Sequence, residues 1–347
     1  MVPRRALAEG HDRSPMLENR AGKLRLDMNE NLLGCSPSVR AALQRLSAEA
    51  LSMYPEKETA IARLAPAFGV HADEMLVVGG IDDGLRLIAD AYIERGRTVL
   101  LVEPTFPMYR FYAEQRDARI RTLRYDGEMR FPLRDVLRVL NTGPSVFFLA
   151  NPNNPTGSLL GARSLEKILN AAKRTLVVVD EAYFEFSGVT VLPKIRRRRN
   201  LVVTRTFSKA TGIAGLRTGC IFAHREMAKI LKRAQAPFPI GTAALAAAGA
   251  ALKDRAFVRR AVQEIRRGRE ILERGLSRLG VRAFPSAANF VLADFGAPCL
   301  PIIDALAQRG ILVRDQASYF DRPGLVRITV GAAAQMRRFL RILETLL

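Results

Sequence analysis

The sequence predicts an α/β fold, in which a three-layer large domain is built around a mostly parallel sheet and a smaller α+β domain follows it. Two observations indicate this class. Between residues 75 and 225, apolar β-branched runs alternate with helical patterns, which is typical of a largely parallel sheet buried on both faces. After about residue 245 the pattern changes, and long Arg-rich amphipathic stretches precede a few short strands.

The expected elements follow this alternation in order. A helix should start at Ser36-Pro37, where a capping residue precedes a first-turn proline, and a second should cover 57–68. Strands are then expected at 75–80, 98–104, 119–125, 145–152, 175–183, 201–207 and 219–225, with helices at 83–94, 106–115, 132–140 and 164–173. The small-residue tract at 242–252 is interpreted as a packed helix.

The smaller domain should contain a helix at 256–279, an antiparallel pair within 282–295, a helix at 300–309, strands at 311–315 and 326–330, and a last helix at 334–346. The predicted domain organisation is an N-terminal arm (1–35) that joins the small domain, a large domain (36–244) and a small C-terminal domain (245–347).

Composition argues against several classes of protein. No apolar run approaches the roughly 20 residues that span a bilayer, and the N-terminus lacks the apolar core of a signal peptide. We therefore expect a cytoplasmic protein without a membrane partner. The three cysteines and three histidines match neither a disulfide framework nor a metal-ligand spacing, so no metal site is expected.

The formal net charge of +20 calls for a nucleic-acid hypothesis, because basic surfaces attract polyanions. The arginines are spread along the chain, however, and only 196–199 and 266–269 form clusters. No recognised nucleic-acid-binding signature accompanies them. We expect no specific nucleic-acid binding; the alternative is a basic nucleic-acid-binding protein on an inactive enzyme scaffold.

Polar side chains follow the carboxyl ends of several predicted strands, which is where parallel α/β sheets bind ligands. Lys209 follows a strand at the edge of the core, where partial burial lowers the pKa of an amine. Asp180 follows three valines, and a buried carboxylate needs a cationic partner, either a pyridinium nitrogen or an arginine. Asn154 in NPNNPTG and Tyr183 could donate hydrogen bonds to a ring oxygen.

Phosphate ligands are expected at a second set of positions. The turn GGIDDG (79–84) leads from a strand into a helix, so backbone amides such as those of Asp82 and Asp83 can meet a phosphate at the helix N-terminus. Ser208 and Arg217 flank the lysine and complete this set.

An aromatic ring could complete the site. Phe106 and Tyr109 follow another strand, where either ring could stack on a flat cofactor or simply fill the core. Together, an amine, a carboxylate, ring-oxygen donors and phosphate ligands describe a pyridoxal phosphate site, in which the lysine forms a Schiff base and the aspartate keeps the pyridine protonated.

The sequence resembles the fold-type I pyridoxal-phosphate aminotransferases, most closely the histidinol-phosphate aminotransferases, nearly from end to end. The motifs that carry the resemblance are DMNEN, EPTFPMY, NPNNPTG, DEAYFEF, FSKATGIAGLR, SAANF, GILVRD and VRITVG. The resemblance implies that Lys209 binds the cofactor and moves the substrate proton. It also implies that Asp180 pairs with the pyridine nitrogen, that Tyr183 and Asn154 face the ring hydroxyl, and that Tyr109 stacks on the ring.

The resemblance extends to partner and substrate. Tyr54 resembles the tyrosine that this family gives across a dimer interface to the neighbouring cofactor phosphate, which implies a homodimer. Arg327 and Arg314 match the arginines that hold the anionic group of the substrate, and Asn31 in the arm is expected beside the substrate with Asn154.

The implied reaction is transamination in histidine biosynthesis, between histidinol phosphate and 2-oxoglutarate on one side and imidazole acetol phosphate and glutamate on the other. Two related activities stay open: an aromatic amino acid aminotransferase and a threonine-phosphate decarboxylase.

Overall fold

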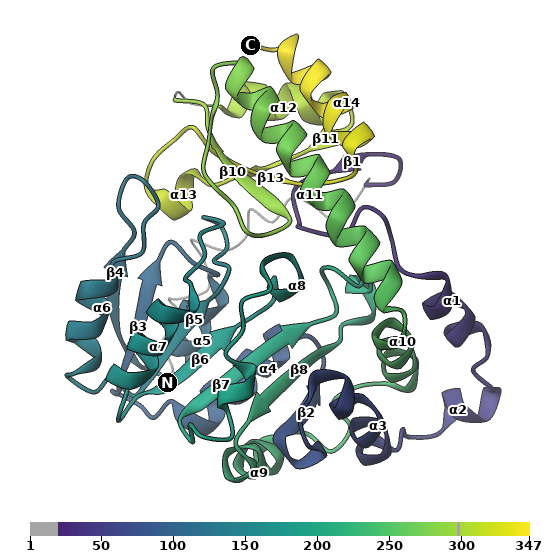
Figure 1. The fold of residues 1–347 in the computed structure, drawn as a ribbon, viewed down its shortest axis with the longest axis vertical. Helices are drawn as coiled ribbons and strands as arrows, with labels where there is room; N and C mark the ends of the chain where they lie inside the picture. Colours follow the sequence, from purple (N-terminus) through teal and green to yellow (C-terminus); the bar gives the residue numbers. More distant parts are fainter. Residues whose placement is uncertain (1–19, 297–298) are drawn as a thin grey trace, which may run out of the picture.

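The computed structural model describes residues 20–296 and 299–347, and its largest feature is a seven-stranded sheet (Figure 1). The strand order is β2-β8-β7-β6-β5-β3-β4. Strand β8 runs antiparallel to both of its neighbours, and the other neighbouring pairs are parallel. The strands are β2 (Met75–Val78), β3 (Thr98–Glu103), β4 (Arg119–Arg124), β5 (Val146–Ala150), β6 (Leu176–Asp180), β7 (Leu201–Thr206) and β8 (Gly219–Ala223).

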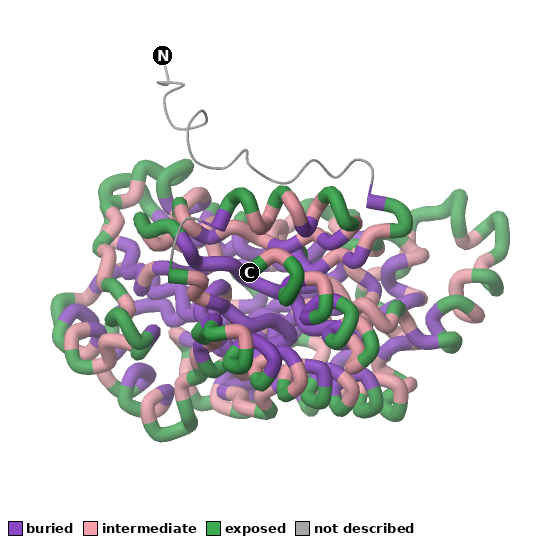
Figure 2. The backbone as a smooth tube through the Cα atoms, turned by 90° about the horizontal axis from the view of Figure 1, so that it is seen from above, coloured by how far each residue is buried: buried purple, intermediate pink, exposed green. Residues whose placement is uncertain are grey.

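Helices cover both faces of this sheet, as the predicted three-layer class requires. One face packs against α4 (Ile81–Tyr92), α5 (Met108–Gln115) and α9 (Arg225–Ala234). The other packs against α1 (Pro37–Gln44), α3 (Lys57–Leu64), α6 (Leu133–Leu140), α7 (Ala162–Ala171) and α10 (Thr242–Lys253). Neighbouring residues of a strand point to opposite faces, so β6 buries Val177 and Val179 on one side and Val178 on the other. Figure 2 shows the resulting buried inner layer enclosed by helices with exposed outer faces.

A second, antiparallel sheet lies at the C-terminal end of the chain, in the order β12-β13-β10-β9. Its strands are β9 (Arg282–Ala283), β10 (Phe290–Asp294), β12 (Arg314–Asp315) and β13 (Leu325–Thr329). The long helix α11 (Arg255–Arg278) and α14 (Ala333–Glu344) pack beside each other, and both contribute to the same apolar core as β10 and β13. The remaining helices are α2 (Ala48–Ser52), α8 (Phe184–Ser187), α12 (Leu300–Gln308) and α13 (Ala317–Phe320).

The arm runs along the smaller sheet before the chain enters α1. Strand β1 (Leu24–Arg25) pairs in parallel with β11 (Ile311–Leu312), and the Thr329 N–H donates to the Leu26 carbonyl oxygen. Residues 1–19 of the predicted arm lie outside the described residues. The domain limits at 35 and 244 stay a prediction.

Two of the differences between the predicted and the observed elements have a clear physical reason. The single strand expected at 311–315 divides at Val313 into β11, which pairs with the arm, and β12, which pairs with β13. The division allows the segment to pair with two different strands, β1 and β13, and β1 is almost 300 residues away in sequence, so no local pattern predicts it. Helix α9 was not predicted, because Lys and Arg dominate its exposed face and only Ala228 and Leu231 are buried.

Within the described residues, no helix is long and apolar enough to cross a membrane.

Candidate active site

Asp180 ends β6 as a buried carboxylate with neutral partners. The Tyr109 hydroxyl donates to Oδ2 at 2.7 Å, while the Thr204 hydroxyl and the Ala182 N–H donate to Oδ1 at 3.0 and 3.1 Å. Burial raises the pKa of Asp180 above its usual value, although these hydrogen bonds oppose the shift. No arginine or lysine in residues 20–296 and 299–347 forms an ion pair with it, so the carboxylate is available to an external cation.

The neighbouring Glu181 takes the arginine instead. Arg205 donates to Glu181 Oε2 through Nε and Nη2, at 3.0 and 2.8 Å, and the Val191 N–H donates to Oε1. An ion pair with an arginine was the alternative interpretation for Asp180, and the structure gives this ion pair to Glu181 instead.

Lys209 lies in the loop after β7, and its Nζ donates to the Met28 carbonyl oxygen of the arm at 3.3 Å. Burial lowers its pKa to about 8, and the positive charge of Arg327 acts in the same direction. A substantial fraction of this amine is therefore unprotonated near neutral pH, as a nucleophile requires.

The two predicted ring-oxygen donors, Tyr183 and Asn154, each accept a hydrogen bond on their oxygen. Asn29 Nδ2 donates to the Tyr183 hydroxyl at 3.0 Å, and Arg327 Nη1 donates to Asn154 Oδ1 at 2.6 Å. The Lys209 Nζ lies 5.7 Å from the centre of the Tyr183 ring. Among the described residues, neither the Asn154 amide nitrogen nor the Tyr183 proton has an acceptor, so both can serve a further one.

Among the described residues, Arg327 is a buried cation whose hydrogen-bond acceptors are all neutral. Nη2 donates to the Asp27 carbonyl oxygen at 2.5 Å, Nη1 donates to Asn154, and Nε has no hydrogen-bond partner among the described residues. Burial lowers the pKa of Arg327, and the nearby Arg314 lowers it further. The two arginines are paired in register on β13 and β12, so positive charge is concentrated here without a carboxylate ion pair.

The N-terminus of α4 forms a cradle for an anion. Gly80 is the capping residue, with a φ of 89° and no side chain, so no side-chain oxygen occupies the amides of the first turn. A Cβ atom at Gly80 would lie 2.6 Å from Arg217 Nη2, which shows how closely that guanidinium covers the turn. Asp82 holds Arg217 with a 3.0 Å ion pair, and the buried Ser208 follows on the neighbouring loop.

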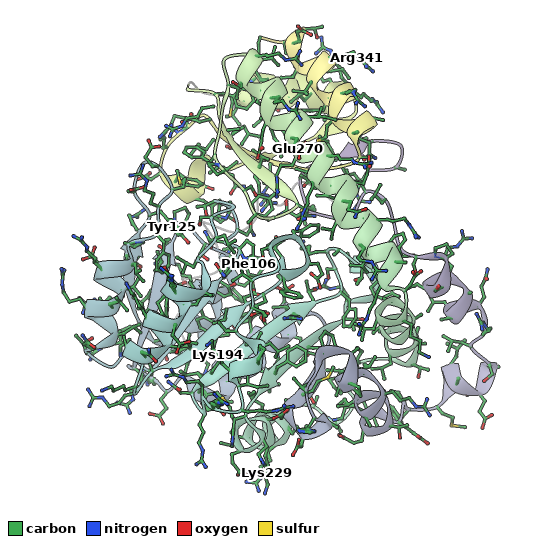
Figure 3. All side chains as sticks on the ribbon, in the orientation of Figure 1. Phe106, Tyr125, Lys194, Lys229, Glu270 and Arg341 are labelled. Atoms are coloured by element: carbon green, nitrogen blue, oxygen red, sulfur yellow. The ribbon has the colours of Figure 1, made fainter. Side chains whose placement is uncertain are left out.

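Tyr109, the residue expected to stack on the cofactor ring, lies inside the core. Its ring is fully buried, lies parallel to the Phe148 ring at 5.2 Å between centres, and supports Asp180 through its hydroxyl. Phe106 is only partly buried, and Figure 3 labels it near the level where the large sheet meets the C-terminal part of the chain. Of the two aromatic residues, Phe106 is therefore better placed to offer a ring face.

Asn31 reaches the lysine loop, whereas Tyr54 lies at the surface. The Asn31 amide nitrogen donates to the carbonyl oxygen of Ala210, the residue after Lys209, and its oxygen accepts the Leu33 N–H within the arm. Tyr54 is 76% exposed and stacks on Phe238 at 4.0 Å between ring centres.

The sequence interpretation missed Asn29 and Thr204. Thr204 pairs in register with Asp180 on the neighbouring parallel strand, so two polar residues ending adjacent apolar runs were a usable signal. Asn29 lies two residues before Asn31 in the same motif, and only the tertiary structure distinguishes their roles.

Comparisons with known proteins show the family of the chain. The family model of aminotransferase class I and II matches residues 21–343. A histidinol-phosphate aminotransferase 2 of Methylococcus capsulatus is 37% identical, over 93% of this chain and 90% of the relative. The histidinol-phosphate aminotransferase of Symbiobacterium thermophilum is 38% identical, with the same two shares covered.

Two solved structures have the same fold. The histidinol-phosphate aminotransferase of Sinorhizobium meliloti, in complex with pyridoxal-5'-phosphate, has a TM-score of 0.86 and 27% identity, covering 94% of this chain and 92% of that one. The L-threonine-O-3-phosphate decarboxylase of Porphyromonas gingivalis has a TM-score of 0.83 and 26% identity, covering 93% and 99%. The chain therefore belongs to the class I and II aminotransferases, the pyridoxal-phosphate enzymes that its motifs resemble.

Proposed function

We propose that this aminotransferase transfers the amino group of histidinol phosphate to 2-oxoglutarate. The observation that carries the proposal is Arg327: a buried guanidinium with neutral partners, one unpaired nitrogen and a second arginine in register beside it. A buried cation of this kind is costly unless an anion completes it. A phosphate offers several oxygens to two guanidinium groups, and a glutamate carboxylate can take the same place in the second half-reaction.

The residues present fit pyridoxal phosphate. The uncapped first turn of α4, Ser208 and Arg217 would hold its phosphate, and Asp180 would hold the proton of the pyridine nitrogen. Tyr183 and Asn154 would donate to the ring oxygen, and Phe106 rather than Tyr109 would cover the ring. When bound, the cofactor supplies an aldehyde that condenses with amines and a protonated ring that withdraws electrons.

Each remaining part of the chemistry falls to a group of this chain. Lys209 Nζ, with a pKa near 8, can take and return a proton at the amine-bearing carbon of the substrate. Thr204 and Tyr109 keep the Asp180 carboxylate oriented and ionised. Arg327 and Arg314 bind the far end of the substrate and so fix its reacting carbon beside Lys209.

A panel of amine donors tests the substrate. We expect the highest kcat/KM with histidinol phosphate, well above phenylalanine, tyrosine and threonine phosphate. A clear preference for an aromatic amino acid would make the protein an aromatic aminotransferase, and release of carbon dioxide from threonine phosphate would identify a decarboxylase. An Arg314→Gln variant is the matched control: it should lose activity on histidinol phosphate more than on phenylalanine.

We also propose a homodimer in which Tyr54 serves the partner's cofactor phosphate. Support comes from a cluster of exposed apolar residues around it: Leu51 and Met53 are each 63% exposed and Phe238 is 51% exposed. A cluster of this kind on a folded protein favours an interface.

Subunit mixing tests the shared site. Lys209→Ala and Tyr54→Ala subunits should each be impaired alone, and mixing them should restore one complete site per heterodimer. If mixing restores nothing although heterodimers form, Tyr54 does not act in the neighbouring subunit.

A further inference from the structure

Asn29 is hydrogen-bonded through its backbone N–H, its backbone carbonyl oxygen and both ends of its side chain. It is 1% exposed and adopts a left-handed backbone with a φ of 53°, which asparagine tolerates better than most residues. Its N–H donates to Thr329 Oγ1 at 2.9 Å, and its carbonyl oxygen accepts the Asn289 amide at 3.0 Å. Its side chain reaches Tyr183. Asn29 thus joins the arm, the smaller sheet and the active site.

The hydrogen-bond network fixes which end of the Asn29 amide faces Tyr183. Thr329 Oγ1 accepts the Asn29 N–H, and its own proton is donated to Asn29 Oδ1 at 3.1 Å. The amide nitrogen is therefore the end that meets the Tyr183 oxygen, at 3.0 Å. An amide nitrogen only donates, so the Tyr183 oxygen must be the acceptor in this contact.

The Tyr183 proton must then point away from Asn29. Among the described residues, the structure gives the Tyr183 proton no acceptor. Lys209 Nζ lies over the face of the Tyr183 ring, 5.7 Å from the ring centre. Burial raises the pKa of Tyr183 and keeps the phenol protonated, while the Asn29 hydrogen bond partly opposes the rise. The hydroxyl is therefore an oriented donor.

We propose that Asn29 is a positioning residue: it holds the Tyr183 hydroxyl as an acceptor on one side, so that the phenol proton is directed to the ring oxygen of the bound cofactor. This inference rests on the proposed cofactor contact of Tyr183. It makes the folded arm part of the cofactor site, because the segment that carries Asn29 must be docked on the smaller sheet before Tyr183 is oriented.

A general tethering role for the arm is the competing explanation, and Asn31 provides the matched control. Asn31 also fixes the arm through its side chain, to the Ala210 carbonyl oxygen, but it does not contact Tyr183. Loss of either asparagine would loosen the arm, whereas only loss of Asn29 should act through the phenol.

A double-mutant cycle on apo protein separates the two explanations. The variants are Asn29→Gly, which keeps the left-handed backbone accessible, Tyr183→Phe, their combination, and Asn31→Gly with and without Tyr183→Phe. The dissociation constant for pyridoxal phosphate is measured by absorbance titration. We expect Asn29→Gly to weaken binding by about 3–10-fold, as for the loss of one hydrogen bond, and to add nothing in the Tyr183→Phe background. The effect of Asn31→Gly should be the same in both backgrounds.

A second measurement needs no cofactor. With ¹³C-labelled tyrosine and Tyr183→Phe for assignment, NMR follows the titration of the Tyr183 phenol in the apo protein. Asn29→Gly should raise its pKa, since the hydrogen bond that favours the phenolate is lost, and Asn31→Gly should not. If Asn29→Gly fails to fold, Thr329→Val tests the same contact, because it removes the hydroxyl that holds the Asn29 side-chain amide in its orientation.

Multiplicative effects of Asn29→Gly and Tyr183→Phe on binding, or an unmoved phenol titration, would overturn the proposal. Neither measurement uses an amine donor. A protein that prefers another substrate than histidinol phosphate would therefore refute the proposed function and leave this inference standing.

Discussion

Asp180→Asn should stabilise the apo protein and at the same time disable cofactor binding. Asparagine has nearly the same shape, and its oxygen can accept from Thr204 and the Ala182 N–H as the carboxylate does. The Tyr109 hydroxyl can turn to accept from the new amide nitrogen. The substitution thus keeps the hydrogen bonds and removes one buried charge.

The sign of the stability change follows from the raised pKa of Asp180. A carboxyl group whose pKa is raised by folding costs stability once it is ionised, and this cost appears as the pH rises from the unfolded to the folded pKa. Removal of the charge should increase the free energy of unfolding of the apo protein by about 1–2 kcal/mol at neutral pH. The gain should shrink as the pH falls through the raised folded pKa of Asp180 and disappear below the ordinary value of 3.8, where the group is protonated in both states.

The affinity for the cofactor should fall in the same Asp180→Asn variant. Loss of one partner of a buried ion pair costs about 3–5 kcal/mol, which corresponds to pyridoxal phosphate binding weakened by about 10²–10⁴-fold. Urea unfolding of the apo protein and absorbance titration with the cofactor measure the two effects separately. A variant that is less stable than the wild type and binds the cofactor equally well would refute the assignment of Asp180.

Two further predictions concern the lysine loop. The rate at which the apo protein reacts with pyridoxal phosphate should rise with pH through a midpoint near 8, because the neutral amine of Lys209 is the reactive form. Arg327→Gln should move this midpoint upward, since the positive charge of Arg327 lowers the pKa of Lys209. A rate that does not change with pH would contradict the role of Lys209. Gly212→Ala should lower the free energy of unfolding by about 2–4 kcal/mol, since φ is +72° and the new Cβ would lie 2.0 Å from the Gly34 carbonyl oxygen. Gly215→Ala is the control, as nothing lies within 4 Å of its added Cβ, and similar unfolding curves for both variants would refute the close contact.

Much of the large sheet follows from local sequence patterns. Apart from the partly exposed edge strand β4, its strands are buried on both faces. Each of these therefore appears as a largely apolar run, and the polar residues that end them are conspicuous. This is why the sequence pattern alone indicates Asp180 and Lys209 as site residues. The same argument failed to separate Phe106 from Tyr109, because both follow one strand and only tertiary packing determines which ring becomes enclosed.

The arm is where local patterns are least informative. Asn29 and Asn31 differ by two positions in one irregular segment, yet one reaches Tyr183 and the other a backbone carbonyl of Ala210. Those contacts span more than 150 residues of sequence and depend on how β13 and the lysine loop approach each other. No periodicity within the arm encodes that approach.

The central claim is that Arg327 and Arg314 recognise a phosphate at the far end of the substrate. The most direct measurement is kcat/KM for amine transfer from histidinol phosphate, compared with histidinol, which lacks only the phosphate. Two charge-assisted contacts of about 1.5–3 kcal/mol each predict that kcat/KM falls by about 10²–10⁴-fold without the phosphate. Equal rates for the two amines would contradict the account.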